Sequence, residues 1–268
     1  MIGFAETFGA ILGSFLIPAF IALLTISIAA RYARPMYLAA FAIGLYFWFF
    51  SDTIGDTSLL GVSEGFTGGV WHAALWVCFA VGLLLLVSLD KSTFAEGSAG
   101  ERFGFAIPVL VAIAVGLHGF GEGAAIGATA ATTPSPNLLD AFGGSSAAVA
   151  FILHKGLEPM MVGAAYWVYA KGHASNTNER LKDLLVLTLA FTLPGIIGGA
   201  SAYYIVQALP SVDFTYVFAL GLGASLYAAV RLARPLFQAS DSGSESVRIA
   251  ACVLLGFTCL YLAAMLHS

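Results

Sequence analysis

The stretch Leu117-His118-Gly119-Phe120-Gly121-Glu122-Gly123-Ala124-Ala125-Ile126-Gly127 places an imidazole and a carboxylate four residues apart inside a long apolar run. A second pair with the same spacing, His154 and Glu158, lies in the next apolar run. Residues four apart on a helix lie one above the other on the same face. Each run therefore predicts a helix with His and Glu on one stripe. Two such stripes facing each other would form a site of two imidazoles and two carboxylates.

The composition is that of an integral membrane protein. Of the 268 residues, 59% are hydrophobic and only 10% are charged, whereas a soluble domain carries about 25% charged residues. The net charge is −4 and the basic residues form no cluster, so we expect lipid contacts and no nucleic-acid partner. The three cysteines fall in apolar runs and are interpreted as packing residues.

Eight apolar runs are long enough to cross a bilayer, which takes about 20 residues. They cover residues 8–30, 36–58, 69–90, 104–130, 141–170, 183–208, 212–232 and 246–266. The predicted fold class is therefore an all-α integral membrane protein with eight transmembrane helices, in which residues 1–268 form a single transmembrane domain. The two His-Glu pairs lie in the fourth and fifth runs.

The basic residues predict an orientation in the membrane. Ten of the eleven Lys and Arg residues lie in or beside the connections that follow the first, third, fifth and seventh runs. By the positive-inside rule these connections are cytoplasmic, and both termini are extracytoplasmic. The exception is Lys155, in the middle of the fifth run. We therefore expect a multi-pass protein of the cell membrane.

The remaining polar residues of interest lie inside the predicted spans, namely Asp52, Asp56, His118, Glu122, His154, Lys155 and Glu158. A charge near the bilayer centre costs roughly 2.5–3.5 kcal/mol on insertion scales, so such groups face the bundle interior and compensate one another. His118 and His154 lie near the middle of their runs and hence at the same depth. Asp52 and Asp56 lie in the outer half of the second run, where they either line the path of a cation and support its ligands or have a structural role.

Imidazole and carboxylate together are typical ligands of Zn²⁺, Fe²⁺ and Mn²⁺, whereas Ca²⁺ and Mg²⁺ favour all-oxygen sites. We expect His118, Glu122, His154 and Glu158 to bind a divalent metal ion, with zinc as the leading candidate and iron or manganese as alternatives. Lys155 has three possible roles. It neutralises Glu122 or Glu158, forms a buried ion pair with an aspartate, or fills the volume of a second cation.

These motifs, with eight helices and both termini outside, resemble the ZIP (zinc/iron-regulated transporter-like) family. The fourth helix of that family carries the pattern His-(Asn/Ser)-x-x-(Glu/Asp)-Gly-x-Ala-(Ile/Leu)-Gly, which is matched at His118, Glu122, Gly123, Ala125, Ile126 and Gly127. The chain departs from the pattern at Gly119, where the family usually has a polar ligand. In the fifth helix His154 and Glu158 match, while Leu157 replaces a proline.

The resemblance implies a carrier, not an enzyme, that moves a divalent metal ion toward the cytoplasm, and it suggests a homodimer. Many members of the family hold two metal ions. Gly119 and Lys155 stand where ligands of the second metal would be, so we predict one metal, with Lys155 in place of the other. The histidine-rich loop that the family carries between its third and fourth helices is absent, because residues 91–103 contain no His.

Two other functions stay open. An intramembrane metal-dependent hydrolase would need an open metal position for water and a general base, and usually a third His. Only two His lie at mid-depth, since His72 lies at the outer end of the third run. A bundle whose polar pairs conduct protons without binding metal is the second alternative.

Overall fold

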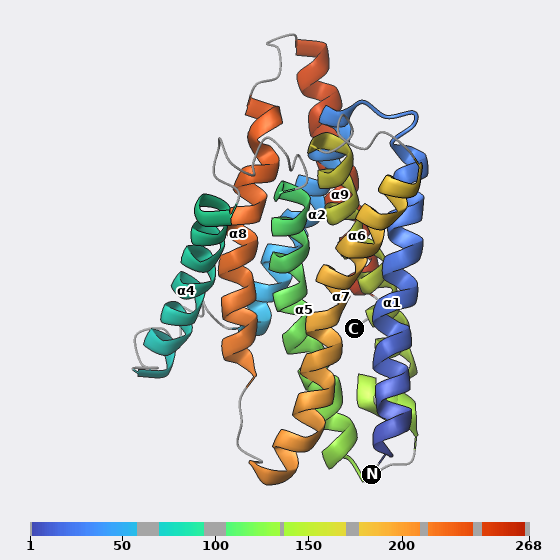
Figure 1. Ribbon diagram of the computed structural model, residues 1–268, viewed down its shortest axis with the longest axis vertical. Helices are drawn as coiled ribbons and strands as arrows, with labels where there is room; N and C mark the ends of the chain where they lie inside the picture. Colours follow the sequence, from blue (N-terminus) through green and yellow to red (C-terminus); the bar gives the residue numbers. More distant parts are fainter. Residues whose placement is uncertain are drawn as a thin grey trace.

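The chain folds into a bundle of long helices in a computed structural model that describes residues 2–57, 70–93, 106–134, 137–169, 177–209, 214–237 and 243–265 (Figure 1). The elements are α1 (Phe4–Ala29), α2 (Pro35–Thr57), α4 (Val70–Thr93), α5 (Ala106–Thr132), the short 3₁₀ helix η1 (Leu138–Phe142), α6 (Ser145–Tyr169), α7 (Thr177–Ala208), α8 (Thr215–Phe237) and α9 (Gly243–Ala264). Each predicted run corresponds to one of these eight α-helices, so the all-α fold class is confirmed.

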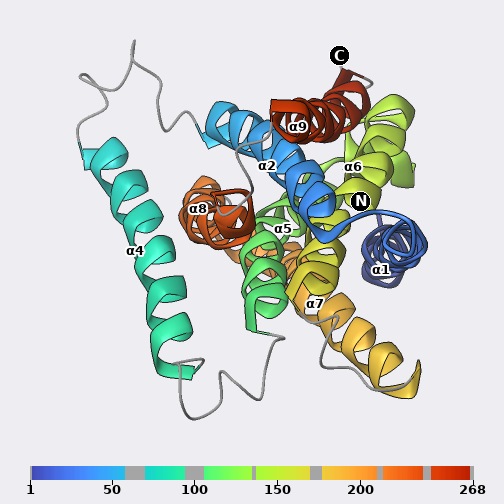
Figure 2. The same cartoon turned by 90° about the horizontal axis from the view of Figure 1, so that it is seen from above.

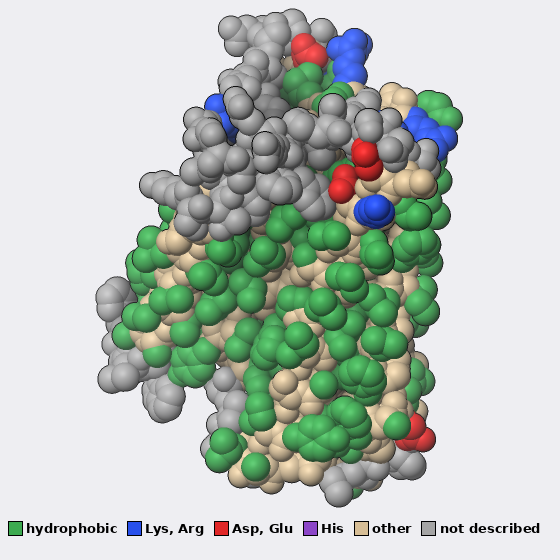
Figure 3. Space-filling model, in the orientation of Figure 1, with side chains coloured by type: hydrophobic (Ala, Val, Ile, Leu, Met, Phe, Trp, Pro, Cys, Tyr) green, Lys and Arg blue, Asp and Glu red, His purple; other side chains and the backbone are tan. Residues whose placement is uncertain are grey.

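Seven of the eight helices in the described ranges are long and apolar enough to cross a membrane. The remaining helix, α6, has 25 residues and hence the length, but His154, Lys155 and Glu158 lower its mean hydropathy. The face drawn in Figure 3 is apolar through its middle, and the charged side chains gather mainly at its upper end. This distribution is that of a multi-pass membrane bundle.

Helix α5 lies inside the bundle and packs against α7 along its length, with α8 and α6 on its other sides. Helix α1 packs on α6 and α7, while α2 lies among α6, α8 and α9. Helix α4 stands at the edge and packs mainly on α8 (Figure 2). The two helices that carry the His-Glu pairs, α5 and α6, are therefore both surrounded by other helices.

The backbones of α5 and α7 are in direct contact because glycines line both sides. A Cβ atom at Gly123 would clash with the backbone of Gly195, and one at Gly127 would clash with the backbone of Gly199. Small residues at this spacing let helices in a membrane approach closely. This contact fixes α5 against α7 and leaves another face of α5 directed toward α6.

The start of α6 differs from the prediction. The apolar run 141–170 predicts one helix, but Ala141 and Phe142 belong to η1, and α6 begins at Ser145. Gly143 and Gly144 separate the two elements with φ angles of 89° and 109°, which only glycine adopts readily. The chain therefore turns at these two glycines, and η1 lies beside the first turns of α6.

The buried apolar residues form two clusters, and the polar residues of α5 and α6 lie between them. On α5 the larger cluster includes Leu110–Val115 and the smaller one begins at Ile126. On α6 the order is reversed, with Phe151 in the smaller cluster and Met161–Trp167 in the larger one. The larger apolar cluster thus separates the polar group from the end of the bundle opposite η1, and the smaller cluster lies toward the η1 end.

The glycine contact between α5 and α7 predicts a strong effect of a single methyl group. Gly123→Ala should lower the free energy of unfolding by about 1–3 kcal/mol or more, because its Cβ would overlap the backbone of α7. The control is Gly9→Ala on α1, whose Cβ would have no neighbour within 4 Å. Thermal unfolding in detergent measures both variants, and equal melting temperatures would contradict the contact.

Candidate metal centre

The predicted His-Glu stripes are present on both helices. His118 and Glu122 lie at mid-length in α5, with 3.7 Å between His118 Nε2 and Glu122 Oε1. His154 and Glu158 lie at mid-length in α6, with 3.0 Å between His154 Nε2 and Glu158 Oε1. Both histidines and Glu158 are buried, while the Glu122 side chain keeps 15% of its surface exposed. The spacing of four residues therefore places each imidazole beside its carboxylate, as expected for helices.

Lys155 joins the two stripes. Its ammonium forms ion pairs with Oε2 of Glu122 across the helix interface and with Oε2 of Glu158 on its own helix. The Lys155 side chain is completely buried. Among the described side chains, the ion-pair partners of Lys155 are thus the two glutamates and not Asp52, which agrees with the predicted role of Lys155 in neutralising Glu122 and Glu158.

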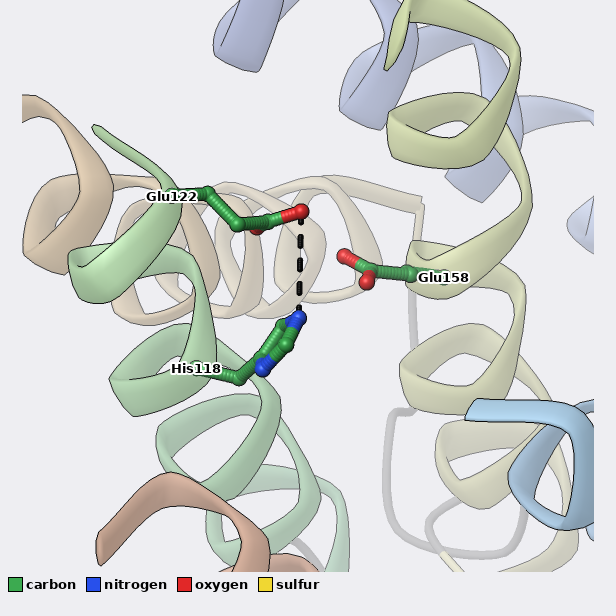
Figure 4. Close-up of side chains that lie close together, drawn as sticks. All are labelled: His118, Glu122 and Glu158. Carbon is green, nitrogen blue, oxygen red and sulfur yellow. Dashed lines mark ion pairs between the residues drawn. The ribbon is translucent and has the colours of Figure 1, made fainter. Parts of the chain in front are cut away.

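Three residues can converge on one metal ion. His118, Glu122 and Glu158 each offer one ligand atom, and these atoms all lie within 4.8 Å of one another (Figure 4). Zn²⁺ with three protein ligands keeps a fourth position for water or another group. The fourth predicted ligand, His154, lies beside the group and is hydrogen-bonded to Glu158.

Aromatic rings hold His118 in place. The centroid of its ring lies 4.6 Å from that of Phe49 on α2 and 5.1 Å from that of Phe218 on α8, both in edge-to-face geometry. Its Nδ1 atom is buried and has no hydrogen-bond partner among the described residues. The two rings therefore pack against the imidazole, whose Nε2 atom lies 3.7 Å from Glu122 Oε1.

A cavity of about 380 Å³ leads away from this group toward η1. Its polar lining residues are Asp52, His118, Glu122, Thr129 and His154, and its apolar lining includes Phe142, Phe151 and Phe218. Asp52 of α2 therefore shares a cavity with three of the predicted ligands. The side chains of Asp56 and His72 lie outside the part of the chain that the structure describes, so their predicted roles stay predictions.

Sequence reasoning missed the aromatic residues of the site. Phe49 and Phe218 contact His118, and three further phenylalanines on α1, α6 and α7 surround the Lys155 ammonium. The chain contains 21 Phe, and no spacing distinguishes these five from the others. They come together only through the packing of five helices.

Comparisons with known proteins leave the site to be interpreted from its own chemistry. No protein-family model matches this chain, and no curated protein matches it. What the fold and the geometry establish is a multi-pass helical bundle with a buried His/Glu group that could bind a metal ion.

The bridging ion pair predicts a large effect of removing the ammonium. Lys155→Met keeps most of the volume but leaves two buried carboxylates without their shared partner, which should cost about 3–5 kcal/mol of unfolding free energy. Adding Glu122→Gln to Lys155→Met should recover part of the loss. Chemical denaturation in mixed micelles measures these energies.

The control for this experiment is the pair of Arg34 and Glu245, which are 3.6 Å apart, with the Arg34 side chain 70% exposed. Exposed ion pairs contribute at most about 1 kcal/mol, so Arg34→Met should change little. A Lys155→Met variant as stable as Arg34→Met would show that the bridging pair does not stabilise the bundle.

Proposed function

We propose that this protein carries a divalent transition-metal ion across the membrane toward the cytoplasm. The observation that supports this most directly is the convergence of His118, Glu122 and Glu158 between two helices at mid-depth. Ionisable groups inside a membrane bundle mark substrate and ion pathways, and transporters place their substrate near the midplane. The metal ion is therefore the substrate of this site.

Access to the site is one-sided in this conformation. The cavity extends from Glu122 toward η1, whereas the larger apolar cluster fills the bundle on the other side of the site. With the orientation inferred from the basic residues, the η1 end faces the outside of the cell. A metal ion would therefore reach the ligands from outside, and release to the cytoplasm would require the larger cluster to open.

The donor set favours zinc, with iron and manganese as alternatives. Mixed nitrogen and oxygen ligands suit these ions, and conduction requires a site that binds its ion and also releases it. The resemblance to the ZIP family supports the same substrate class. In this proposal Lys155 stands in place of a second cation, and the site holds one metal ion per chain.

Uptake into proteoliposomes tests the proposal. Wild-type protein should take up Zn²⁺, and His118→Ala and Glu122→Gln should each lose about tenfold or more of the rate, because even residues that only support a metal ligand contribute 10–100-fold. Glu6→Gln, an exposed carboxylate of α1, is the matched control and should keep the wild-type rate. Fe²⁺ and Mn²⁺ are measured in the same assay to rank the substrates.

Two outcomes would contradict the carrier. Purified protein that binds a metal ion tightly but moves none would favour the metal-dependent hydrolase, which product formation from lipid or peptide substrates then tests. Protein that holds no metal and dissipates a pH gradient would favour a proton-conducting bundle. Metal content per chain and proton flux are therefore measured on the same preparation.

Asp52 provides a separate test of the access route. It lines the cavity without belonging to the group of metal ligands, and a carboxylate in a cleft raises the local cation concentration. Asp52→Asn should raise the KM for Zn²⁺ uptake by about two- to tenfold and leave kcat within about twofold. A loss of kcat at unchanged KM would instead place Asp52 in the transport step itself.

A further inference from the structure

The Lys155 ammonium is enclosed by aromatic rings as well as carboxylates. Its Nζ atom lies 5.5 Å from the ring centroid of Phe15, 5.8 Å from that of Phe151 and 5.8 Å from that of Phe191. These distances are within the range of cation–π attraction, which reaches about 2 kcal/mol when the cation is desolvated. The three rings are buried and come from α1, α6 and α7.

Two glycines make room for this enclosure. A Cβ atom at Gly119 would lie 3.3 Å from Phe15 Cε1, and one at Gly195 would overlap the same ring. The Phe15 and Phe151 rings pack edge to face, with centroids 5.6 Å apart at 68°. A Cβ atom at position 119 would therefore make a tight contact with the Phe15 ring, which would have to shift by a few tenths of an ångström. Gly119 and Gly195 thus both lie against the Phe15 ring, which is one of the three rings around the ammonium.

The groups that surround the Lys155 Nζ atom suit an ammonium ion better than a second divalent metal ion. The described contacts of Nζ are one oxygen from Glu122, one from Glu158 and three phenyl rings. A divalent transition metal needs about four nitrogen, oxygen or sulfur ligands, and phenyl rings offer none. An ammonium ion can donate hydrogen bonds to the two carboxylates and form cation–π contacts with the phenyl rings.

We propose that the space between Glu122, Glu158 and the three phenylalanines is a subsite for a primary ammonium group, filled by Lys155 in the native chain. When the lysine is shortened, the subsite takes a free alkylammonium ion and not a second divalent metal. The subsite shares Glu122 and Glu158 with the proposed metal site. Its test uses amine binding with a chelator present, so a failure of metal transport leaves it standing.

The experiment is chemical rescue of Lys155→Ala. This variant lacks Cγ, Cδ, Cε and Nζ, which n-propylammonium replaces atom for atom. In EDTA, n-propylammonium should raise the melting temperature of Lys155→Ala and not that of the wild type, whereas 1-propanol, which has no charge, should raise neither. The number of Zn²⁺ ions bound per chain, measured separately without amine or chelator, should not be higher in the variant than in the wild type.

The role of the rings is tested by fluorinating one of them, which withdraws electron density from its face and changes its shape little. Trifluorophenylalanine at position 191 in Lys155→Ala should weaken n-propylammonium binding by about two- to thirtyfold, the range that corresponds to one cation–π contact. The same substitution at Phe20, which is 58% exposed on α1, is the control and should change nothing. Equal effects of the amine and of propanol, or an additional Zn²⁺ ion in Lys155→Ala, would overturn the proposal.

A second variant keeps the test valid if Lys155→Ala does not fold. In the wild-type chain, trifluorophenylalanine at position 191 should lower the melting temperature, because Lys155 itself occupies the subsite, and the same residue at position 20 should not. Equal melting temperatures for the two labelled proteins would show that the rings do not hold the ammonium.

Discussion

The bundle is organised around one electrostatic constraint, which is that two carboxylates lie together in the middle of a membrane. Without a partner, Glu122 and Glu158 would repel each other and would each lose their hydration. Lys155 reduces their combined formal charge from −2 to −1 and connects α5 to α6. The remaining negative charge, at the inner end of a cavity, still attracts a cation. The same ion pair therefore links the two carboxylates and leaves a net negative charge beside the group that could bind a metal ion.

Packing decides where this charged group can form. Helix α5 contacts the backbone of α7 through Gly123 and Gly127, and a Cβ atom at Gly221 of α8 would lie 2.6 Å from the backbone nitrogen of His118. Helix α5 is thus held on two faces, and the stripe of His118 and Glu122 is directed to the interface with α6. The backbone contacts with α7 and α8 therefore fix where the backbone of α5 carries His118 and Glu122.

The sequence predicted the features that depend on one helix alone, and it missed the contacts that depend on the packing of several helices. The spacing of four residues is enough to place His118 beside Glu122 and His154 beside Glu158, and the apolar runs are enough to predict eight helices. The partners of Lys155 depend on how α5 and α6 are rotated about their axes, which no local pattern records. The ring enclosure draws on Phe15 and Phe191, which are far apart in the chain. The late start of α6 depends on two adjacent glycines inside an otherwise apolar run.

The two oxygens of each carboxylate, Glu122 and Glu158, lie beside different side chains, and this limits how a metal ion could bind. Glu122 directs Oε2 to Lys155 and has Oε1 near His118, while Glu158 directs Oε2 to Lys155 and Oε1 to His154. A metal ion can therefore approach His118 and Glu122 while Lys155 stays in place. Glu158 can join as the third ligand only if one of its oxygens is shared with, or released from, His154 or Lys155. If the oxygen is released and not shared, binding of a metal ion by Glu158 would require a rearrangement on α6, the helix on which Lys155 and His154 both lie.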